Sequence, residues 1–187
     1  MTDKPLETVL FRLVDIVDGM GIHYMLMGGM ATRIWGLPRS TFDVDVTLSL
    51  ASDALSGFCS RLEQAGFVVP EPHRKGFADT LKGMGKFSFQ DYAFSPPILV
   101  DCFLPTTAYQ REAISRRREV ELEGRNVWVI SPEDLILHKL VAGRPRDLDD
   151  IDDILLVQDR TMDLAYLRKW AAALGVTSLL NERMPKE

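Results

Sequence analysis

Apolar residues recur along the chain with two different spacings, and these spacings predict its first elements. Between residues 6 and 17 they recur every three or four positions after Pro5, which indicates a helix. The short apolar segment 23–27 lies between glycines, as is typical of a buried strand. Residues 42–50, FDVDVTLSL, alternate polar and apolar side chains, which is the pattern of a strand with one buried face.

Further patterns predict a mixture of helices and strands up to about residue 130, and helices alone after it. The expected elements are a helix at 30–35, a helix from the N-cap Ser52 to Ala65, a strand at 67–69, a loop at 71–85, strands at 86–94 and 98–103, a helix at 106–116, and a hairpin of residues 118–122 and 127–130. Ser131, followed by proline and two acids, is a strong helix start, and more helices are expected at 146–157 and after 162. This order predicts a mixed α/β core of residues 1–130 with a helical C-terminal part, residues 131–187, packed on it.

Composition changes this picture little. The 187 residues are 46% hydrophobic and 26% charged, which is ordinary for a globular protein with a real core. No apolar run is long enough for a membrane span, and the first residues lack the pattern of a secretion signal, so we expect a cytoplasmic protein without a membrane partner. Cys59 and Cys102 are flanked by apolar residues and are expected to be buried, reduced thiols.

The formal net charge of −5 argues against a general nucleic-acid binder, because nonspecific affinity depends on neutralising phosphates. A basic stretch from Arg111 to Arg125 could still bind a polyanion, or it could be a solvated helix and hairpin. The acidic cluster from Asp147 to Asp153 lacks the central glycine and the terminal glutamate of a calcium loop. We therefore expect a helix with a solvated acidic face there.

Three aspartates are candidates for metal chemistry. Asp43 and Asp45 are two positions apart on the predicted strand, so their carboxylates share one face at a spacing of about 6.5–7 Å. Asp101 lies in the otherwise apolar segment 98–104, where a buried carboxylate needs a compensating partner. Neighbouring strands would bring the three acids together, as an arrangement that holds two Mg²⁺ ions requires. The alternatives are a solvated acidic edge strand and an Asp101 that pairs with an arginine.

Two other features could bind substrate. Gly28-Gly29 ends the apolar strand and opens a helix, and free N–H groups at a helix N-terminus attract phosphate, although a tight strand–helix turn explains the pair equally well. Lys139 is the only formal charge in the apolar segment 135–140. It could contact a phosphate, or its ammonium could extend outward to water.

These residues together resemble a known family. Gly28-Gly29, then Arg39-x-Thr41-x-Asp43-x-Asp45, then a later strand aspartate is similar to the DNA-polymerase-β-type nucleotidyltransferase superfamily. Within it, the chain is most similar to AbiEii-like abortive-infection toxins and related bacterial proteins. That narrower likeness rests on Ser131-Pro132-Glu133-Asp134-Leu135, Lys139-Leu140, Arg144, Asp147 and Asp150. The resemblance covers about residues 20–157 and implies the nucleotidyltransferase fold, a mixed β-sheet flanked by helices with a helical C-terminal part.

The resemblance also implies an activity, the transfer of a nucleoside monophosphate from an NTP such as ATP to a hydroxyl. The metal ligands for Mg²⁺ or Mn²⁺ would be Asp43, Asp45 and Asp101, with Asp101 also a candidate base. The nucleotide site would include Gly28, Gly29, Arg39 and Thr41, and Lys139 would contact phosphate or acceptor. One departure is that the family's usual serine after the first glycine is Gly29 here, so a hydroxyl contact is lost.

The implied acceptor is an RNA such as a tRNA end, a protein side chain, or a small molecule such as an aminoglycoside or lincosamide, and a cognate antitoxin is an expected partner. Two other hypotheses stay open at this point. One is a catalytically degenerate fold that serves as a nucleotide-binding or antitoxin module. The other is a structural protein whose acids pair with the Arg116–Arg118 cluster.

Overall fold

The structure, a computed structural model, describes residues 4–81, 83–158 and 161–184. Its strands form one mixed sheet in the order β3-β4-β5-β2-β1-β7-β6. They are β1 (Tyr24–Leu26), β2 (Asp43–Leu48), β3 (Asp79–Leu81), β4 (Met84–Asp91), β5 (Ile98–Leu104), β6 (Arg118–Leu122) and β7 (Arg125–Val129). The fold class predicted from the sequence, a mixed α/β architecture with a mixed sheet, is confirmed.

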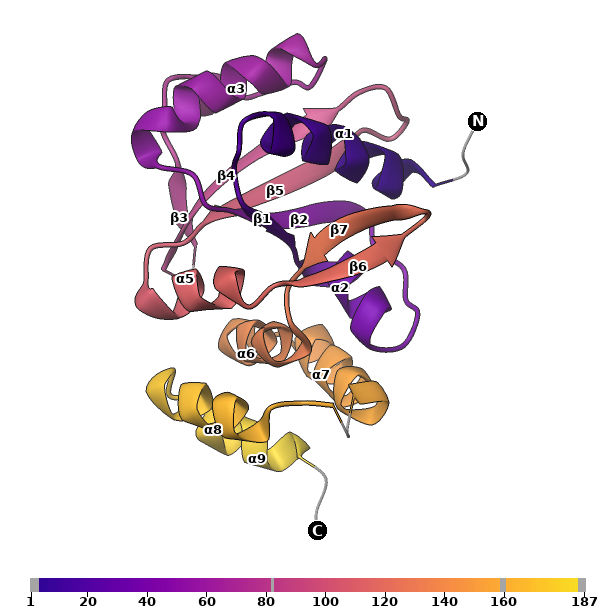
Figure 1. Ribbon diagram of the computed structural model, residues 1–187, viewed down its shortest axis with the longest axis vertical. Coiled ribbons are helices and arrows are strands. Elements are labelled where there is room, and N and C mark those ends of the chain that lie inside the picture. Colours follow the sequence, from indigo (N-terminus) through magenta and orange to yellow (C-terminus); the bar gives the residue numbers. More distant parts are fainter. Residues whose placement is uncertain (1–3, 82, 159–160, 185–187) are drawn as a thin grey trace.

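Helices cover both faces of this sheet. They are α1 (Pro5–Gly19), α2 (Gly28–Trp35), the 3₁₀ turn η1 (Ser52–Ala54), α3 (Leu55–Gln64), α4 (Glu71–Arg74), α5 (Ala108–Ser115), α6 (Pro132–Ala142), α7 (Pro145–Gln158), α8 (Leu164–Ala173) and α9 (Thr177–Arg183). Helices α1 and α3 lie on one side of the sheet, whereas α2 and α5 to α9 lie on the other, with α8 and α9 farthest from the strands (Figure 1). None of the described helices is long and apolar enough to cross a membrane.

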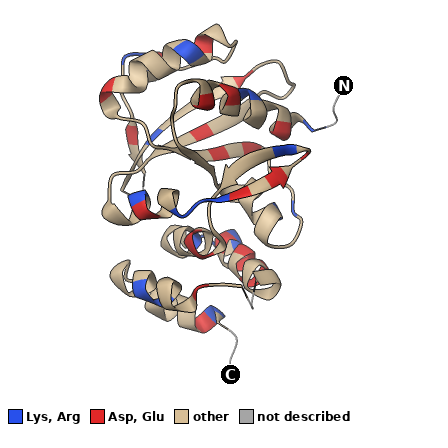
Figure 2. Ribbon diagram, viewed as in Figure 1, with Lys and Arg blue, Asp and Glu red and all other residues tan. Residues whose placement is uncertain are grey.

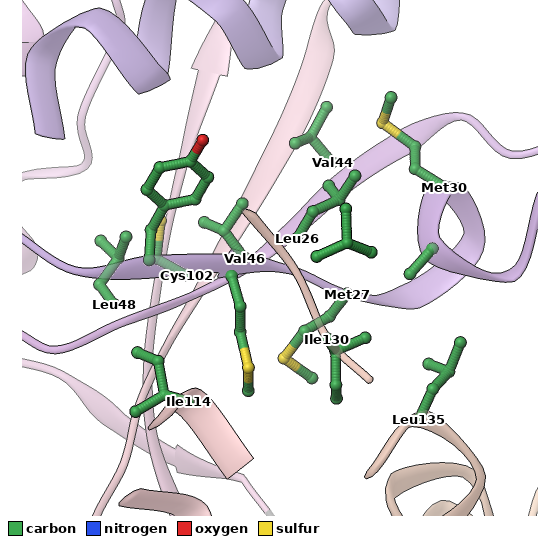
Figure 3. Packing of buried hydrophobic residues seen from close by; sticks show 14 of the residues in the cluster. Leu26, Met27, Met30, Val44, Val46, Leu48, Cys102, Ile114, Ile130 and Leu135 are labelled. Carbon is green, nitrogen blue, oxygen red and sulfur yellow. The ribbon is translucent and has the colours of Figure 1, made fainter. Parts of the chain in front are cut away.

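The hydrophobic core lies around the central strands β1, β2 and β5. Val44 and Val46 are fully buried, as the alternation in the sequence predicted, and Cys102 of β5 is buried beside them (Figure 3). Strand β2 pairs in parallel with β5, so that Asp45 lies opposite Asp101. Burial of one face of β2 thereby fixes the direction of its other face, which carries Asp43 and Asp45.

The predicted start of α6 and the first strand of the predicted hairpin are confirmed. Helix α6 begins after Ser131, whose Oγ accepts a hydrogen bond from the backbone N–H of Asp134. The hairpin turns at Glu123-Gly124, where both residues have positive φ, so its second strand β7 begins at Arg125, earlier than the predicted residue 127. Cys59 and Cys102 are buried free thiols.

The segment from residue 52 to 85 was predicted less well. The expected loop at 71–85 contains α4, β3 and the first residues of β4. The three side chains of β3 are all exposed, so this edge strand has no alternation of burial that the sequence could reveal. The expected strand at 67–69 makes only an isolated bridge between Val68 and Gln90, and Ser52 begins η1 without acting as an N-cap.

Candidate active site

Three aspartates lie on one face of neighbouring strands. Asp43 and Asp45 alternate along β2 with the buried valines, so both carboxylates leave the core on the same side. Asp101 of β5 is the register partner of Asp45 and is 9% exposed. The structure therefore brings together the three acids that the sequence singled out, and it does so through the parallel pairing of β2 and β5.

Asp45 is the one of these three acids whose carboxylate has neither a hydrogen-bond donor nor an ion-pair partner among the described residues. Burial, and then the nearby carboxylates of Asp43 and Asp101, raise the pKa of Asp45 to about 7, while Lys86 and Arg144 act weakly in the opposite direction. An added cation would relieve this electrostatic strain.

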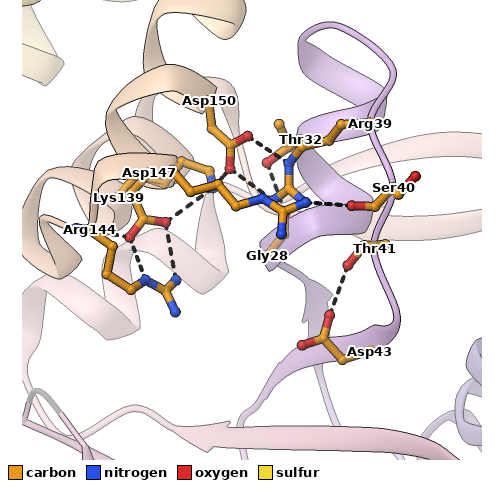
Figure 4. Close-up of polar contacts among 11 residues, drawn as sticks. Gly28, Thr32, Arg39, Ser40, Thr41, Asp43, Lys139, Arg144, Asp147 and Asp150 are labelled. Carbon is orange, nitrogen blue, oxygen red and sulfur yellow. Dashed lines mark hydrogen bonds and ion pairs between the residues drawn. The ribbon is translucent and has the colours of Figure 1, made fainter.

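The glycine turn packs directly against these carboxylates. Gly28 has φ +58°, and a Cβ at this position would lie 1.8 Å from Oδ2 of Asp45. A Cβ on Gly29 would lie 2.3 Å from Oγ1 of Thr41, and the Thr41 hydroxyl donates a hydrogen bond of 2.8 Å to Asp43. Gly29 has no side-chain hydroxyl, but the Thr41 hydroxyl lies where a side chain at position 29 would begin. Figure 4 shows the hydrogen bond from this hydroxyl to Asp43.

We expect Gly29→Ala to lower the free energy of unfolding by about 1–3 kcal/mol, because the new methyl group overlaps the Thr41 side chain. Urea denaturation followed by circular dichroism measures the change. The matched control is Gly57→Ala in α3, where nothing lies within 4 Å of the added Cβ, and it is expected to stabilise the protein by up to about 1 kcal/mol. An equal response of both variants would contradict the packing argument.

Asp101 already has two hydrogen-bond donors. Nζ of Lys86 lies 2.7 Å from Oδ2 of Asp101, and Oγ of Ser88 donates a hydrogen bond of 2.5 Å to Oδ1. Both donors are on β4, which pairs antiparallel with β5. The partner that the sequence required for Asp101 is therefore a lysine, not an arginine.

A second charged cluster joins α6, α7 and the segment between α2 and β2, beside the aspartates. Lys139 is 5% exposed, and its Nζ lies 2.5 Å from Oδ2 of Asp150 and 3.6 Å from Oδ1 of Asp147. Arg39 donates a hydrogen bond of 2.8 Å to the same Asp150, and Arg144 pairs with Asp147 (Figure 4). Lys139 does not extend to water, so that alternative is wrong.

The expectation of a solvated acidic face on residues 147–153 is also wrong in part. Asp147 and Asp150 are 3% and 2% exposed, whereas Asp149 and Asp152 are exposed. The two buried acids are three positions apart, on the helix face that packs toward the core with Ile151. Their burial is tolerated because Lys139, Arg39 and Arg144 compensate the charge.

The Arg116–Arg118 cluster is not part of the site. Arg116 stacks on the ring of Tyr166 and lies 3.7 Å from Asp134, and Arg118 pairs with Glu133. In the described ranges, no arginine forms an ion pair with Asp43, Asp45 or Asp101. Acidic and basic residues are mixed along the ribbon (Figure 2), and Arg116 and Arg118 are paired with the buried acids Asp134 and Glu133.

One cavity of about 760 Å³ connects these features. All eight residues predicted from the sequence line it, namely Gly28, Gly29, Arg39, Thr41, Asp43, Asp45, Asp101 and Lys139. Several other lining residues were not predicted as site residues, among them Lys86, Arg146, Phe103, Tyr109, His138 and Leu174. The cavity thus has an acidic floor, a cationic side and an apolar wall. In the sequence, polar and apolar residues alternate from Lys86 to Gln90, and this pattern could have placed Lys86 on the strand face opposite the buried Phe87 and Phe89.

The carboxylate donors suit Mg²⁺ or Mn²⁺, which prefer oxygen ligands. Within the described part of the chain, however, no three His, Cys, Asp or Glu side chains are grouped closely enough to hold a metal ion. Asp101 is held by Lys86 and Ser88, which leaves Asp43 and Asp45 as the two site aspartates in the cavity lining that have no cationic partner among the described residues. The residues present therefore fit a divalent cation at Asp43 and Asp45.

Comparison with known families gives a partial match. The model of a family described as a nucleotidyltransferase of unknown function (DUF6036) matches residues 104–185, which is less than half of the chain. No curated protein matches. The matched segment begins at the end of β5 and contains Lys139 and Asp150, but none of the three aspartates of the site.

Solved structures share the fold. An antigenic nucleotidyltransferase-like protein from Paracoccidioides brasiliensis aligns with a TM-score of 0.57 at 17% identity, over 100% of this chain and 96% of that one. ANT(2")-Ia in complex with adenylyl-2"-tobramycin aligns with a TM-score of 0.58 at 18% identity, over 90% of this chain and 95% of that one. The lincosamide antibiotic adenylyltransferase LnuA, bound to lincomycin, aligns with a TM-score of 0.54 at 16% identity, over 79% of this chain and 95% of that one. The chain has the nucleotidyltransferase fold, and these comparisons do not extend to AbiEii-like toxins.

Proposed function

We propose that this protein transfers a nucleoside monophosphate from an NTP to a hydroxyl acceptor. The observation that carries the proposal is the convergence of Asp43, Asp45 and Asp101 beside the Gly28-Gly29 turn in one cavity. An uncompensated carboxylate beside free backbone N–H groups suits a substrate that brings phosphates and a cation together. The shared fold and the partial family match are consistent with this activity.

In the proposed reaction, the acceptor oxygen forms a bond to the α-phosphorus, and the bond from that phosphorus to the bridging oxygen of the β-phosphate breaks. Pyrophosphate leaves with the electron pair of the broken bond. The proton of the acceptor hydroxyl passes to the carboxylate of Asp101, whose position is held by its ion pair with Lys86. A bound Mg²⁺ or Mn²⁺ at Asp43 and Asp45 would neutralise phosphate charge.

The remaining predicted residues take the following roles in this proposal. The first N–H groups of α2, at Gly28 and Gly29, bind phosphate oxygens. Thr41 orients Asp43 through its hydrogen bond. Arg39 contacts the triphosphate from the cavity wall, and Lys139, whose ammonium is held by Asp150, positions Arg39 through that shared acid.

For the acceptor, we favour a small hydroxylated molecule. The apolar part of the cavity lining includes Phe103, Tyr109 and Leu174, which suit a compact, partly apolar compound better than an extended polyanion. The solved structures of similar fold include one with adenylyl-tobramycin and one with lincomycin. An RNA acceptor and a cognate antitoxin are the other readings, and they rest on the resemblance to abortive-infection toxins.

Label transfer tests the proposal. The protein is incubated with each α-labelled NTP, Mg²⁺ or Mn²⁺, and in separate reactions tobramycin, lincomycin, total RNA or a cell metabolite extract. We expect labelled product with at least one acceptor, and loss of the product to background in Asp43→Ala. The matched control Asp53→Ala, at an exposed position in η1, should keep full activity. Transfer that survives Asp43→Ala, or a protein that binds no NTP, would overturn the proposal.

A second candidate is a degenerate fold that binds nucleotide without chemistry. Occupation of Asp101 by Lys86 and Ser88 favours it. Calorimetry separates the two, because a binding module should bind ATP equally well in EDTA and in Mg²⁺. A transferase that needs the cation should bind ATP much more tightly in Mg²⁺.

A further inference from the structure

Lys86 places a positive charge inside the acidic site. We propose that Lys86 acts as a fixed cation in place of a second metal ion, so that the protein binds one divalent ion and not two. This inference rests on the proposed function and departs from the two-ion arrangement that the sequence suggested.

The sheet itself fixes the position of Lys86. Strand β4 pairs antiparallel with β5, so Ser88 lies opposite Asp101 and Lys86 lies opposite Phe103, two residues further along the same face. The Lys86 ammonium lies 2.7 Å from Asp101 and 5.7 Å from the centroid of the Phe103 ring. Its side chain is 25% exposed and lines the cavity. Lys86 is therefore part of the floor of the site.

The contacts of Asp101 leave little room for another cation. Lys86 donates a hydrogen bond to Oδ2 and Ser88 donates one to Oδ1, so both oxygens of this carboxylate already accept a hydrogen bond. A divalent ion bridging Asp45 and Asp101 would have to displace the lysine from a largely buried ion pair, in which the two side chains are 25% and 12% exposed. Such a displacement leaves a desolvated ammonium without its partner, which is unfavourable.

The charges of the site lead to the same result. Once Asp45 is ionised, the three carboxylates and one ammonium carry a net charge of −2, which one divalent ion balances. The uncompensated charge is concentrated at Asp45, since Thr41 donates to Asp43 and Lys86 pairs with Asp101. One ion at Asp43 and Asp45 neutralises the group, and a second ion would leave it positively charged. When nucleotide is bound, the Lys86 ammonium faces the cavity and stabilises negative charge on the phosphates.

Counting bound Mn²⁺ tests the proposal without any assay of activity. The full-length protein is titrated with Mn²⁺ at low ionic strength, and electron paramagnetic resonance measures the free ion. We expect one Mn²⁺ per wild-type chain and two per chain in Lys86→Met, with the first ion bound at least about tenfold more tightly than in wild type. Lys86→Arg, which keeps the charge, should bind one.

The matched control is Lys75→Met, which removes an exposed lysine that pairs with Glu71 on the surface and should leave the count at one. Two ions in the wild type would overturn the role of Lys86 and leave the proposed transferase standing. No bound Mn²⁺, together with no binding of ATP, would overturn both. One ion at unchanged affinity in Lys86→Met would overturn the proposal, because the lysine would then only support the fold. A count of two ions in the wild type overturns it even if a variant fails to fold.

Discussion

Asp45→Asn is expected to raise the free energy of unfolding of the metal-free protein by about 4 kcal/mol near pH 8, although it removes a proposed metal ligand. The folded-state pKa of Asp45 is raised from 3.8 to about 7 by burial and by Asp43 and Asp101. As the pH rises from about 4 to 7, the unfolded chain therefore releases this proton before the folded protein does, and stability falls. Asparagine has no charge to desolvate, so the variant avoids that loss.

Urea denaturation in EDTA near pH 4.5 and near pH 8 measures this difference. The advantage of Asp45→Asn should be large at the higher pH and small at the lower one, where Asp45 is protonated in the folded protein. Asp53→Asn at an exposed site is the control and should change little at either pH. Mn²⁺ should stabilise the wild type and have little effect on Asp45→Asn. A variant less stable than wild type near pH 8 in EDTA would disprove the argument.

Much of this site could be predicted because burial leaves a local pattern. Alternation in residues 43–46 predicted two carboxylates on one face of a strand, and the valines between them are fully buried. An aspartate within the apolar segment 98–104 required a partner wherever the strand was placed. These two arguments need only the two-residue period of a strand and the free-energy cost of a buried charge. In the structure, Asp43 and Asp45 share one face of β2, and Asp101 has an ion-pair partner.

Other parts of the site depend on how distant segments pair. Lys86 contacts Asp101 because β4 adds beside β5 in one antiparallel register, and no local pattern specifies that neighbour. The fit of Gly29 against Thr41 is likewise set by the packing of α2 on β2. The division at residue 130 stays a prediction, and the contact of Arg39 with Asp150 links the two parts through side chains that are 111 positions apart.

The burial of Asp147 and Asp150 in α7 also depends on distant partners and was not predicted from the sequence. Its largest expected consequence concerns stability. Asp150→Ala is expected to lower the free energy of unfolding by about 3–5 kcal/mol, because it leaves the buried Lys139 ammonium without its nearest partner. Arg39 also loses its carboxylate, but its side chain is 21% exposed and can still reach water. Urea denaturation near neutral pH measures the loss.

Two comparisons separate this ion pair from a general effect of mutating α7. Asp152→Ala removes a surface contact with Arg183 and should cost less than about 1 kcal/mol. The double variant Asp150→Leu with Lys139→Met replaces the pair by apolar side chains, and it should recover most of the stability that Asp150→Ala loses, since no buried ammonium is left unpaired. Recovery would mean that the pair is kept for the position of Arg39 at the cavity, not for stability. A double variant as unstable as Asp150→Ala would instead assign the loss to packing around α7.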